Sequence, residues 1–384
     1  NLMYQLKKFF VGVLFVIVLV GAIGCTKEQK GETVQEQNAN NEKEDVPYTE
    51  TAIEFEDERI YGSCTMRENS KGIVEYISLS QEQLTKDLKT QSYAYTYSEN
   101  EWECEKTKWG ELLKKELIKR INLKGRIYNS SLSIGADGKL YVTYNFYHPN
   151  AILESKGLDY EYFVSNFLFC IDLDTNDITY VDIPEASGGE SEDEVNPLQC
   201  SAFSDGKLLI QDGKNAYIYD PVVGEKICDV EYVVNAGNYV AGDGVLYSAH
   251  VNNDGVFEVC GYNENDGKVY QKITLELYDS EIMSEVTQYK LKVYGYDLYL
   301  VSKEGIYRLT DGADEFEKVV DGIKNNLIKM TNKDYRIYDF TVLEDECFAV
   351  DYRKLMEESN DFDTYDKEYL VFYQKEGDEE KEQK

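Results

Sequence analysis

Short stretches with the residue preferences of β-strands dominate the chain after residue 50. They are rich in Tyr, Val and Ile and are separated by clusters of Asp, Asn and Gly, which is typical of short β-strands joined by tight turns. One element, an Asp-Gly-like turn followed by a strand, recurs along the chain. Clear copies are at 137–141, 205–209 and 243–247, and weaker ones at 58–61, 296–299 and 345–348. The pattern predicts an all-β body.

A hairpin also recurs, in which a strand, a polar turn and a second strand follow one another. Copies occur at 169–180, 217–227, 259–270 and 305–318, a sixth copy opens at 369–373, and 74–77 resembles the first. Asp-Gly and Asn-Gly turns supply the positive φ that tight hairpins need. Six copies over 48–377 give about 55 residues each, near the length of a propeller blade.

A small antiparallel sheet of this kind cannot bury both of its faces alone, whereas sheets arranged radially cover one another. The repeats therefore predict a β-propeller of about six four-stranded blades over 48–377, with seven as the other possible count. A pair of β-sandwiches is the alternative fold. One amphipathic stretch at 109–122 predicts a helix between the first two repeats. We expect it to pack on the side of the propeller, with a partner-binding role as the alternative; its apolar side would consist of Leu112, Leu113, Leu117, Ile118 and Ile121.

The first 24 residues have the layout of a secretory signal, with Lys7 and Lys8 before an uncharged apolar run. The run is short for a bilayer-spanning helix, which needs about 20 residues. It ends at Ala22-Ile23-Gly24-Cys25, which resembles a bacterial lipobox, although Ala22 departs from the preferred Leu. The resemblance implies lipidation of Cys25 and a lipid-anchored protein on the extracytoplasmic side of a cell membrane. An ordinary secretory signal or a membrane anchor is the alternative.

Residues 25–47 contain almost nothing apolar, so they predict a disordered tether, and 378–384 reads as a charged tail or a truncated linker. The chain has 73 acidic and 40 basic residues, a net charge of −33. Such a charge repels nucleic acids and anionic headgroups. The membrane contact is therefore expected through the lipid alone.

Seven further cysteines follow Cys25, and no CxxC motif occurs among them. Most lie in apolar, strand-like contexts, where a free Cys behaves as a small buried hydrophobe. An exported protein with this many free thiols suggests an environment with little oxidant, and our hypothesis is a Gram-positive anaerobe.

The hairpin sequences over most of 130–320 resemble quinoprotein-like (PQQ-like) propeller repeats, in which a strand ending in Tyr-Asp or Asp-Leu-Asp turns through Thr-Gly or Asn-Gly-Lys. The docking Trp of that family is missing, and Tyr180 and Tyr270 stand near its place, so the resemblance does not imply quinone binding. A lipoprotein of this layout is also similar to the propeller modules that accompany solute-binding lipoproteins of Gram-positive ABC transporters.

Candidate chemistry is sparse. The chain has only two histidines, His148 and His250, and neither has a catalytic motif such as GxSxG beside it. The alternating Asp172, Asp174 and Asn176 lack the Gly and Glu of a calcium loop and predict a hairpin turn. The sequence therefore indicates no catalytic residue, metal or cofactor. It favours a binding or scaffold module, serving solute uptake or envelope assembly, whose tyrosines could stack on a glycan or peptide. A carbohydrate-active propeller enzyme, a glycosidase or lyase, is the alternative.

Overall fold

The structure is a computed structural model that describes most of the chain from residue 48 to residue 375. The described residues are 48–55, 63–84, 87–98, 101–121, 123–148, 157, 164–183, 198–212, 215–233, 237–252, 256–275, 289–302, 304–321, 335–355 and 365–375. They all belong to one compact unit. The predicted signal with Lys7 and Lys8, Cys25, the tether and the tail lie outside the described residues.

The described residues form six antiparallel sheets of four strands each, numbered here as blades 1 to 6. Blade 1 consists of β2 (Ser63–Glu68), β3 (Val74–Leu84), β4 (Asp87–Ser98) and β5 (Glu101–Thr107). Blade 2 consists of β6 (Arg126–Ile134), β7 (Leu140–Tyr147), β8 (Val164–Ile171) and β9 (Ile178–Val181). Blade 3 consists of β10 (Leu198–Ala202), β11 (Leu208–Asp212), β12 (Asn215–Asp220) and β13 (Glu225–Asp229). Blade 4 consists of β14 (Gly237–Ala241), β15 (Leu246–Val251), β16 (Phe257–Tyr262) and β17 (Val269–Leu275). Blade 5 consists of β18 (Lys290–Tyr294), β19 (Asp297–Ser302), β20 (Gly305–Leu309) and β21 (Glu317–Asp321). Blade 6 consists of β22 (Tyr335–Leu343), β23 (Cys347–Leu355), β24 (Tyr365–Lys375) and β1 (Tyr48–Phe55).

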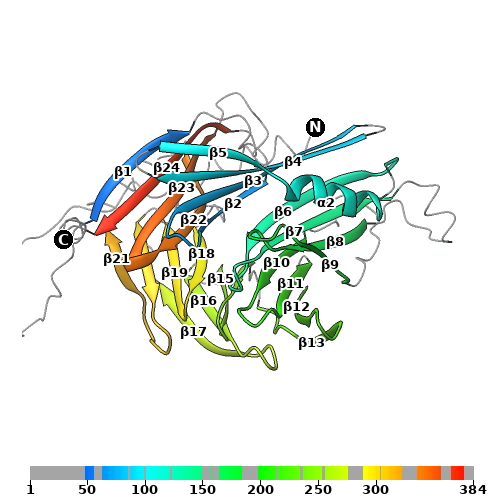
Figure 1. Cartoon of the computed structure of the whole chain (residues 1–384). Helices are drawn as coiled ribbons and strands as arrows, with labels where there is room; N and C mark the ends of the chain where they lie inside the picture. Colours follow the sequence, from blue (N-terminus) through cyan, green and yellow to red (C-terminus); the bar gives the residue numbers. More distant parts are fainter. Residues whose placement is uncertain are drawn as a thin grey trace, which may run out of the picture. The chain divides into compact units, whose positions relative to one another are not determined.

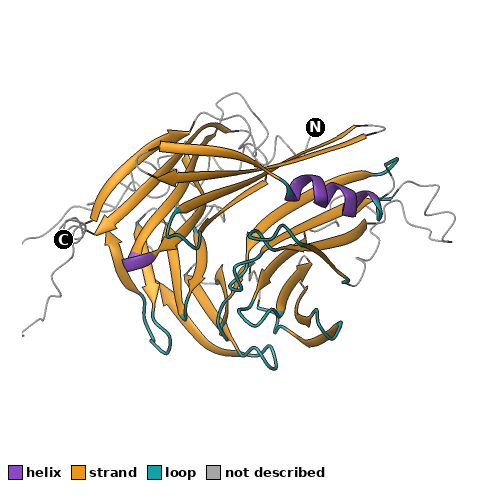
Figure 2. Cartoon of the chain, in the orientation of Figure 1, coloured by secondary structure: helices purple, strands orange, loops and turns teal. Residues whose placement is uncertain are grey.

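The blades follow one another around a ring (Figure 1). The first strand of each blade contacts the first strand of the next, and β22 of blade 6 contacts β2 of blade 1. Nearly all of the drawn elements are strands (Figure 2). The prediction of a six-bladed β-propeller is therefore confirmed in the described residues.

Blade 6 is closed by a strand from the other end of the chain. β1 pairs antiparallel with β24, with Tyr48 opposite Lys375 and Phe55 opposite Glu368. β24 is thus the third strand of blade 6, and the predicted sixth copy at 369–373 lies inside it. β1 completes a blade whose other three strands come from residues 335–375, and this pairing closes the ring.

The recurring Asp-Gly turns join the first strand of a blade to the second. Gly138, Gly206 and Gly244 have φ values of 77°, 85° and 71°, a region that residues with a Cβ rarely adopt. The predicted repeat is therefore one strand out of phase with the blades, since each blade begins with the strand before the Asp-Gly turn. The same turns link the blades, because Ala136 N–H donates to Ala202 O at 3.0 Å.

The core lies between the faces of neighbouring blades, as six apolar clusters. Tyrosines supply much of it, and Tyr95, Tyr144, Tyr247 and Tyr352 are almost fully buried. Strands buried on both faces explain why many of them read as continuous apolar runs rather than strict alternations.

The helix within 109–122 is α2 (Trp109–Ile118). Trp109, Leu113 and Leu117 are buried in the cluster between blades 1 and 2, whereas Leu112 and Ile118 are 37% and 40% exposed. The prediction that all five apolar residues share the buried side was therefore wrong for these two.

No helix among the described residues is long and apolar enough to cross a membrane. The seven cysteines of the described ranges are all free thiols. Cys64, Cys200 and Cys260 are buried, and Cys104 is exposed.

Candidate ligand-binding channel

A cavity of about 750 Å³ runs along the centre of the ring, lined by residues from the first strand of every blade. Its wall also includes turns at the ends of these strands, so the cavity reaches one face of the propeller. Its volume suits a ligand the size of a short oligosaccharide or peptide.

The wall of the channel is balanced in charge, unlike the chain as a whole. Three basic and three acidic side chains line it in the described residues: Arg67, Lys290, Lys292, Glu68, Asp243 and Asp339. A chain with 73 acids and 40 bases would give an acidic wall if the charges were placed at random. The channel therefore concentrates positive charge relative to the rest of the protein.

Lys292 is held in place by the ring itself. Its Nζ donates to the carbonyl oxygen of Phe340 at 2.8 Å and to that of Met66 at 3.2 Å. These carbonyls belong to blades 6 and 1, while Lys292 belongs to blade 5. Lys292 thus joins three blades, and its donors are largely used for structure.

Lys290 lies two residues earlier on the same strand, but its ammonium group has no hydrogen-bond or ion-pair partner in the described part of the chain. It is half-buried in the channel wall. Burial lowers its pKa, the nearby carboxylates of Asp339 and Asp351 raise it, and the Arg353 guanidinium lowers it further. A desolvated cation without a partner is costly, and a ligand oxygen that accepts its hydrogen bonds would remove that cost.

A buried polar cluster borders the channel between blades 1 and 6. The Nη2 atom of Arg353 donates to Cys64 Sγ at 2.5 Å, to Tyr76 Oη at 2.6 Å and to Asp351 Oδ2 at 3.3 Å. The guanidinium also stacks 3.2 Å from the ring centroid of Tyr338, which lines the channel. We call Cys64, Tyr76, Asp351 and Arg353 the closure cluster.

Three tyrosines, Tyr239, Tyr294 and Tyr338, line the channel. Tyr294 is 43% exposed and stands at the turn between β18 and β19. Aromatic rings with polar tips can stack on sugar or peptide groups at such a surface.

The acidic side chains of the channel already accept hydrogen bonds from the protein. Asp339 accepts from Thr65 Oγ1 and Met66 N–H, both at 3.1 Å, and from Phe340 N–H at 2.8 Å. Asp243 accepts from Ser204 Oγ at 2.6 Å. The hydrogen bond from Ser204 lowers the pKa of Asp243 and thus stabilises the charged form of that carboxylate.

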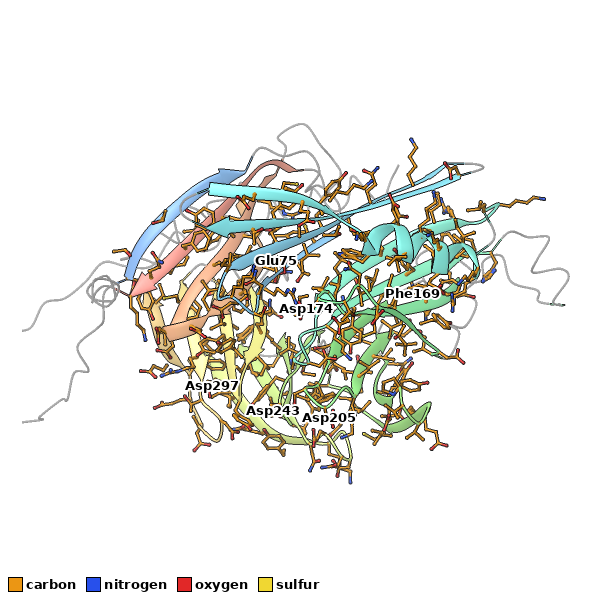
Figure 3. The ribbon with its side chains drawn as sticks, viewed as in Figure 1. Glu75, Phe169, Asp174, Asp205, Asp243 and Asp297 are labelled. Atoms are coloured by element: carbon orange, nitrogen blue, oxygen red, sulfur yellow. The ribbon has the colours of Figure 1, made fainter. Side chains whose placement is uncertain are left out.

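Arg67 closes the channel wall between blades 1 and 2. Its Nε atom lies 2.7 Å from Glu75 Oε2, and Nη2 lies 3.7 Å from Asp174 Oδ1, two residues that Figure 3 places near each other. Asp172 Oδ1 accepts from the N–H groups of Asp174 and Thr175, both at 3.0 Å. Residues 172–176 thus form the hairpin turn that the sequence predicted.

The sequence pointed to few of these residues. His148 and His250 are not among the lining residues, and two tyrosines of β4, Tyr93 and Tyr95, are buried between blades 1 and 6. No sequence motif includes Lys290, Lys292 or Arg353. A signal was nevertheless present, since Lys290 and Lys292 alternate with apolar residues on a strand that begins a blade.

No protein-family model and no curated protein matches the chain. Similar solved structures include the Pyrococcus horikoshii acylaminoacyl peptidase (TM-score 0.35, 10% identity, covering 76% of this chain and 49% of that one). They also include the GH43_1 enzyme from Xanthomonas citri complexed with xylotriose (0.38, 8%, 83% and 90%) and the β-propeller domain of the Trilobed protease from Pyrococcus furiosus (0.32, 13%, 76% and 91%). The chain spans about half the length of the acylaminoacyl peptidase. At these identities the likeness is one of fold, and the activities in those names belong to those proteins.

Proposed function

We propose that this protein is a binding module, anchored to the outer face of a cell membrane by a lipid on Cys25, that takes a polar ligand into its axial channel. Solute uptake or envelope protein assembly are the settings that we propose for it. We also propose a relationship to quinoprotein-like propeller repeats and to the propeller modules that accompany solute-binding lipoproteins of ABC transporters. This relationship rests on the hairpin sequences and the N-terminal layout alone.

The observation that carries the proposal is the ammonium group of Lys290, which lines the channel without a partner in the described residues. A ligand with a carboxylate or another strongly polar oxygen, such as an acidic sugar or a peptide, would supply that partner. The tyrosine rings of the channel would contact its less polar parts.

The test is a screen of the purified protein against glycan and peptide arrays, followed by calorimetry with the best ligand. We expect Lys290→Met to weaken binding at least ten-fold, because the ligand oxygen then loses a charged donor. The matched control is Lys226→Met on β13, whose exposed ion pair with Asp229 lies outside the channel. Equal affinity of the Lys290→Met variant and the wild-type protein would contradict the proposal.

The proposed anchor is tested separately. A Cys25→Ala variant should lose the diacylglycerol adduct, as seen by mass spectrometry, and should leave the membrane fraction. Release of the wild-type protein in soluble form would contradict the anchor without affecting the channel.

A carbohydrate-active enzyme is the second candidate, because the channel does gather the carboxylates of Glu68, Asp243 and Asp339. Glycoside hydrolysis needs two such groups, one of them able to donate a proton. Asp339 is tied to three protein donors, which favours binding over turnover. Cleavage of any glycan that binds, seen as released product, would favour the enzyme over the binding module.

A further inference from the structure

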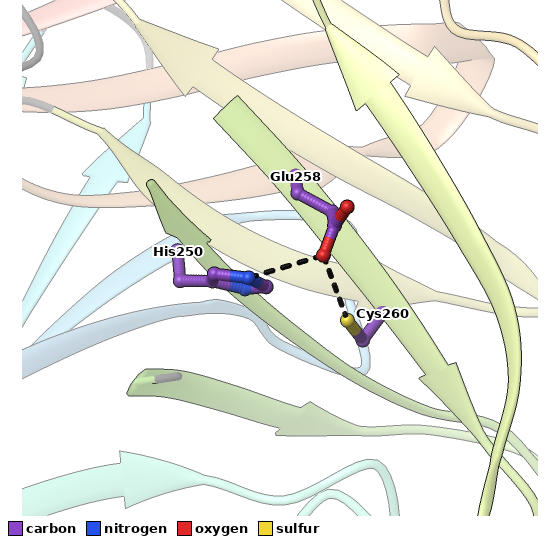
Figure 4. A group of neighbouring side chains, drawn as sticks. All are labelled: His250, Glu258 and Cys260. Carbon is purple, nitrogen blue, oxygen red and sulfur yellow. Dashed lines mark hydrogen bonds and ion pairs between the residues drawn. The ribbon is translucent and has the colours of Figure 1, made fainter. Parts of the chain in front are cut away.

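Blade 4 carries a second polar group, away from the channel, that the function proposed above does not use. It consists of His250 on β15 and Glu258 and Cys260 on β16, drawn in Figure 4. The strand register places His250 directly opposite Glu258, and Cys260 follows two residues later on the same face of the sheet. Three side chains of different chemistry thus lie together on one pair of strands.

The three side chains offer an imidazole nitrogen, a carboxylate oxygen and a thiol sulfur, the donor set that zinc prefers. His250 Nε2 lies 3.1 Å from Glu258 Oε1, and Cys260 Sγ lies 3.8 Å from the same oxygen. Tetrahedral zinc with ordinary bond lengths places an N,O pair about 3.3 Å apart and an O,S pair about 3.5 Å apart. The side chains already stand close to these separations.

The environment of the group combines burial with access. His250 and Cys260 are 4% and 0% exposed, on the face of blade 4 that packs against blade 3. The Glu258 side chain is 13% exposed, and the Nζ atom of the exposed Lys272 lies 3.7 Å from its Oε1. An ion could therefore enter from the side of Glu258 and displace the Lys272 ammonium into solvent.

His250 faces the group with Nε2, so Nε2 is the ring nitrogen that would bind the ion. Nδ1 is the ring nitrogen that would keep the proton. The neutral imidazole is the form that ligates metal, and a bound cation deprotonates a coordinating thiol outright.

We propose that His250, Glu258 and Cys260 bind one zinc ion, with water as the fourth ligand. Binding releases the thiol proton, so that one thiolate and one carboxylate neutralise the two charges of the ion. A site with no net charge is compatible with burial between two blades. The site lies on strands, which hold the ligands more firmly than loops do.

The test uses the full-length protein as it is produced by the cell, purified in detergent, stripped with chelator and titrated with cobalt(II) as a spectroscopic probe for zinc. We expect one equivalent of cobalt to give a thiolate charge-transfer band and the visible bands of a tetrahedral ion. Zinc should displace the cobalt. Zinc should also raise the melting temperature of the wild-type protein, because it binds the folded state.

Variants separate this site from the other thiols. Cys260→Ser should abolish the charge-transfer band, and His250→Gln should lower cobalt affinity at least ten-fold. Lys272→Met should raise the affinity, because it removes the cation that competes for Glu258. Cys104→Ser is the matched control, since it removes the exposed thiol and should leave the spectrum unchanged.

Circular dichroism of the metal-free variants checks that each one folds. A titration without the charge-transfer band in the folded wild-type protein would show that the three side chains only hydrogen-bond to one another, and would overturn the proposal. A band that persists in Cys260→Ser but disappears in Cys104→Ser would overturn it as well. Neither result bears on ligand binding in the channel.

Discussion

The closure cluster between blades 1 and 6 and the group of His250, Glu258 and Cys260 on blade 4 both bury polar side chains between neighbouring sheets. In the closure cluster, one nitrogen of Arg353 contacts three partners on two blades, and Tyr76 donates to Asp351 Oδ2 at 3.1 Å. In the blade 4 group, Glu258 Oε1 is the common partner of His250, Cys260 and Lys272, and all four residues belong to one blade.

The difference lies in which elements the contacts join. A buried ion pair with hydrogen bonds to a second blade fixes the closure of the ring, and the loss of one partner is costly. The contacts of the blade 4 group lie within one sheet, so they hold no blades together and can be exchanged for contacts to an ion. The same contrast holds between the ammonium group of Lys292, which joins three blades, and the ammonium group of Lys290, which makes no hydrogen bond in the described residues.

The largest effect is expected from Arg353→Met, which leaves Asp351 as a buried charge without its guanidinium. We expect the free energy of unfolding to fall by about 3–5 kcal/mol, as for other broken buried ion pairs. Denaturant unfolding followed by circular dichroism measures the change.

Two further variants make this result interpretable. Arg353→Met combined with Asp351→Asn removes both charges and should recover part of the loss. Lys226→Met, which breaks an exposed pair, should change stability by less than about 1 kcal/mol. If Arg353→Met and Lys226→Met had equal effects, the closure cluster would have no special structural role.

The intermediate effect is expected at the two lysines of β18. Lys292→Met removes two hydrogen bonds and leaves the carbonyls of Met66 and Phe340 without this donor, so stability should fall by about 1–3 kcal/mol. Lys290→Met removes a desolvated cation and should leave stability unchanged or higher. The melting temperatures of the two variants measure this difference directly. A larger loss of stability in Lys290→Met than in Lys292→Met would contradict the structural role given to Lys292.

The sequence predicted the fold from local signals and missed what depends on the ring. Asp-Gly turns such as 205–206 and the hairpin at 169–180 are local, so their spacing gave the blade count. The pairing of β1 with β24 joins Tyr48 to Lys375, and no local pattern reports a contact across the whole chain.

The same limit applies to the two sites. Lys290 and Asp339 come together only because the first strands of blades 5 and 6 meet at the axis. His250, Glu258 and Cys260 were within reach, since two of them alternate on one strand and the third lies across a short turn. No local motif marks them, because His250 and Glu258 are opposite each other on two strands and eight residues apart in the chain.

The smallest effect is expected at Asp212 on β11, a half-buried carboxylate with no hydrogen-bond or ion-pair partner in the described residues. Burial raises its pKa, so the folded state holds the proton more tightly than the unfolded chain. Stability from this group is therefore present below the unfolded pKa, about 3.9, and is lost as the pH rises through the folded value. Asp212→Asn cannot ionise, so at pH 7 it should be more stable than the wild-type protein by about 1 kcal/mol or less, and the advantage should vanish near pH 3. Unfolding at both pH values measures this, and a variant less stable than wild type at pH 7 would mean that the carboxylate has a partner after all.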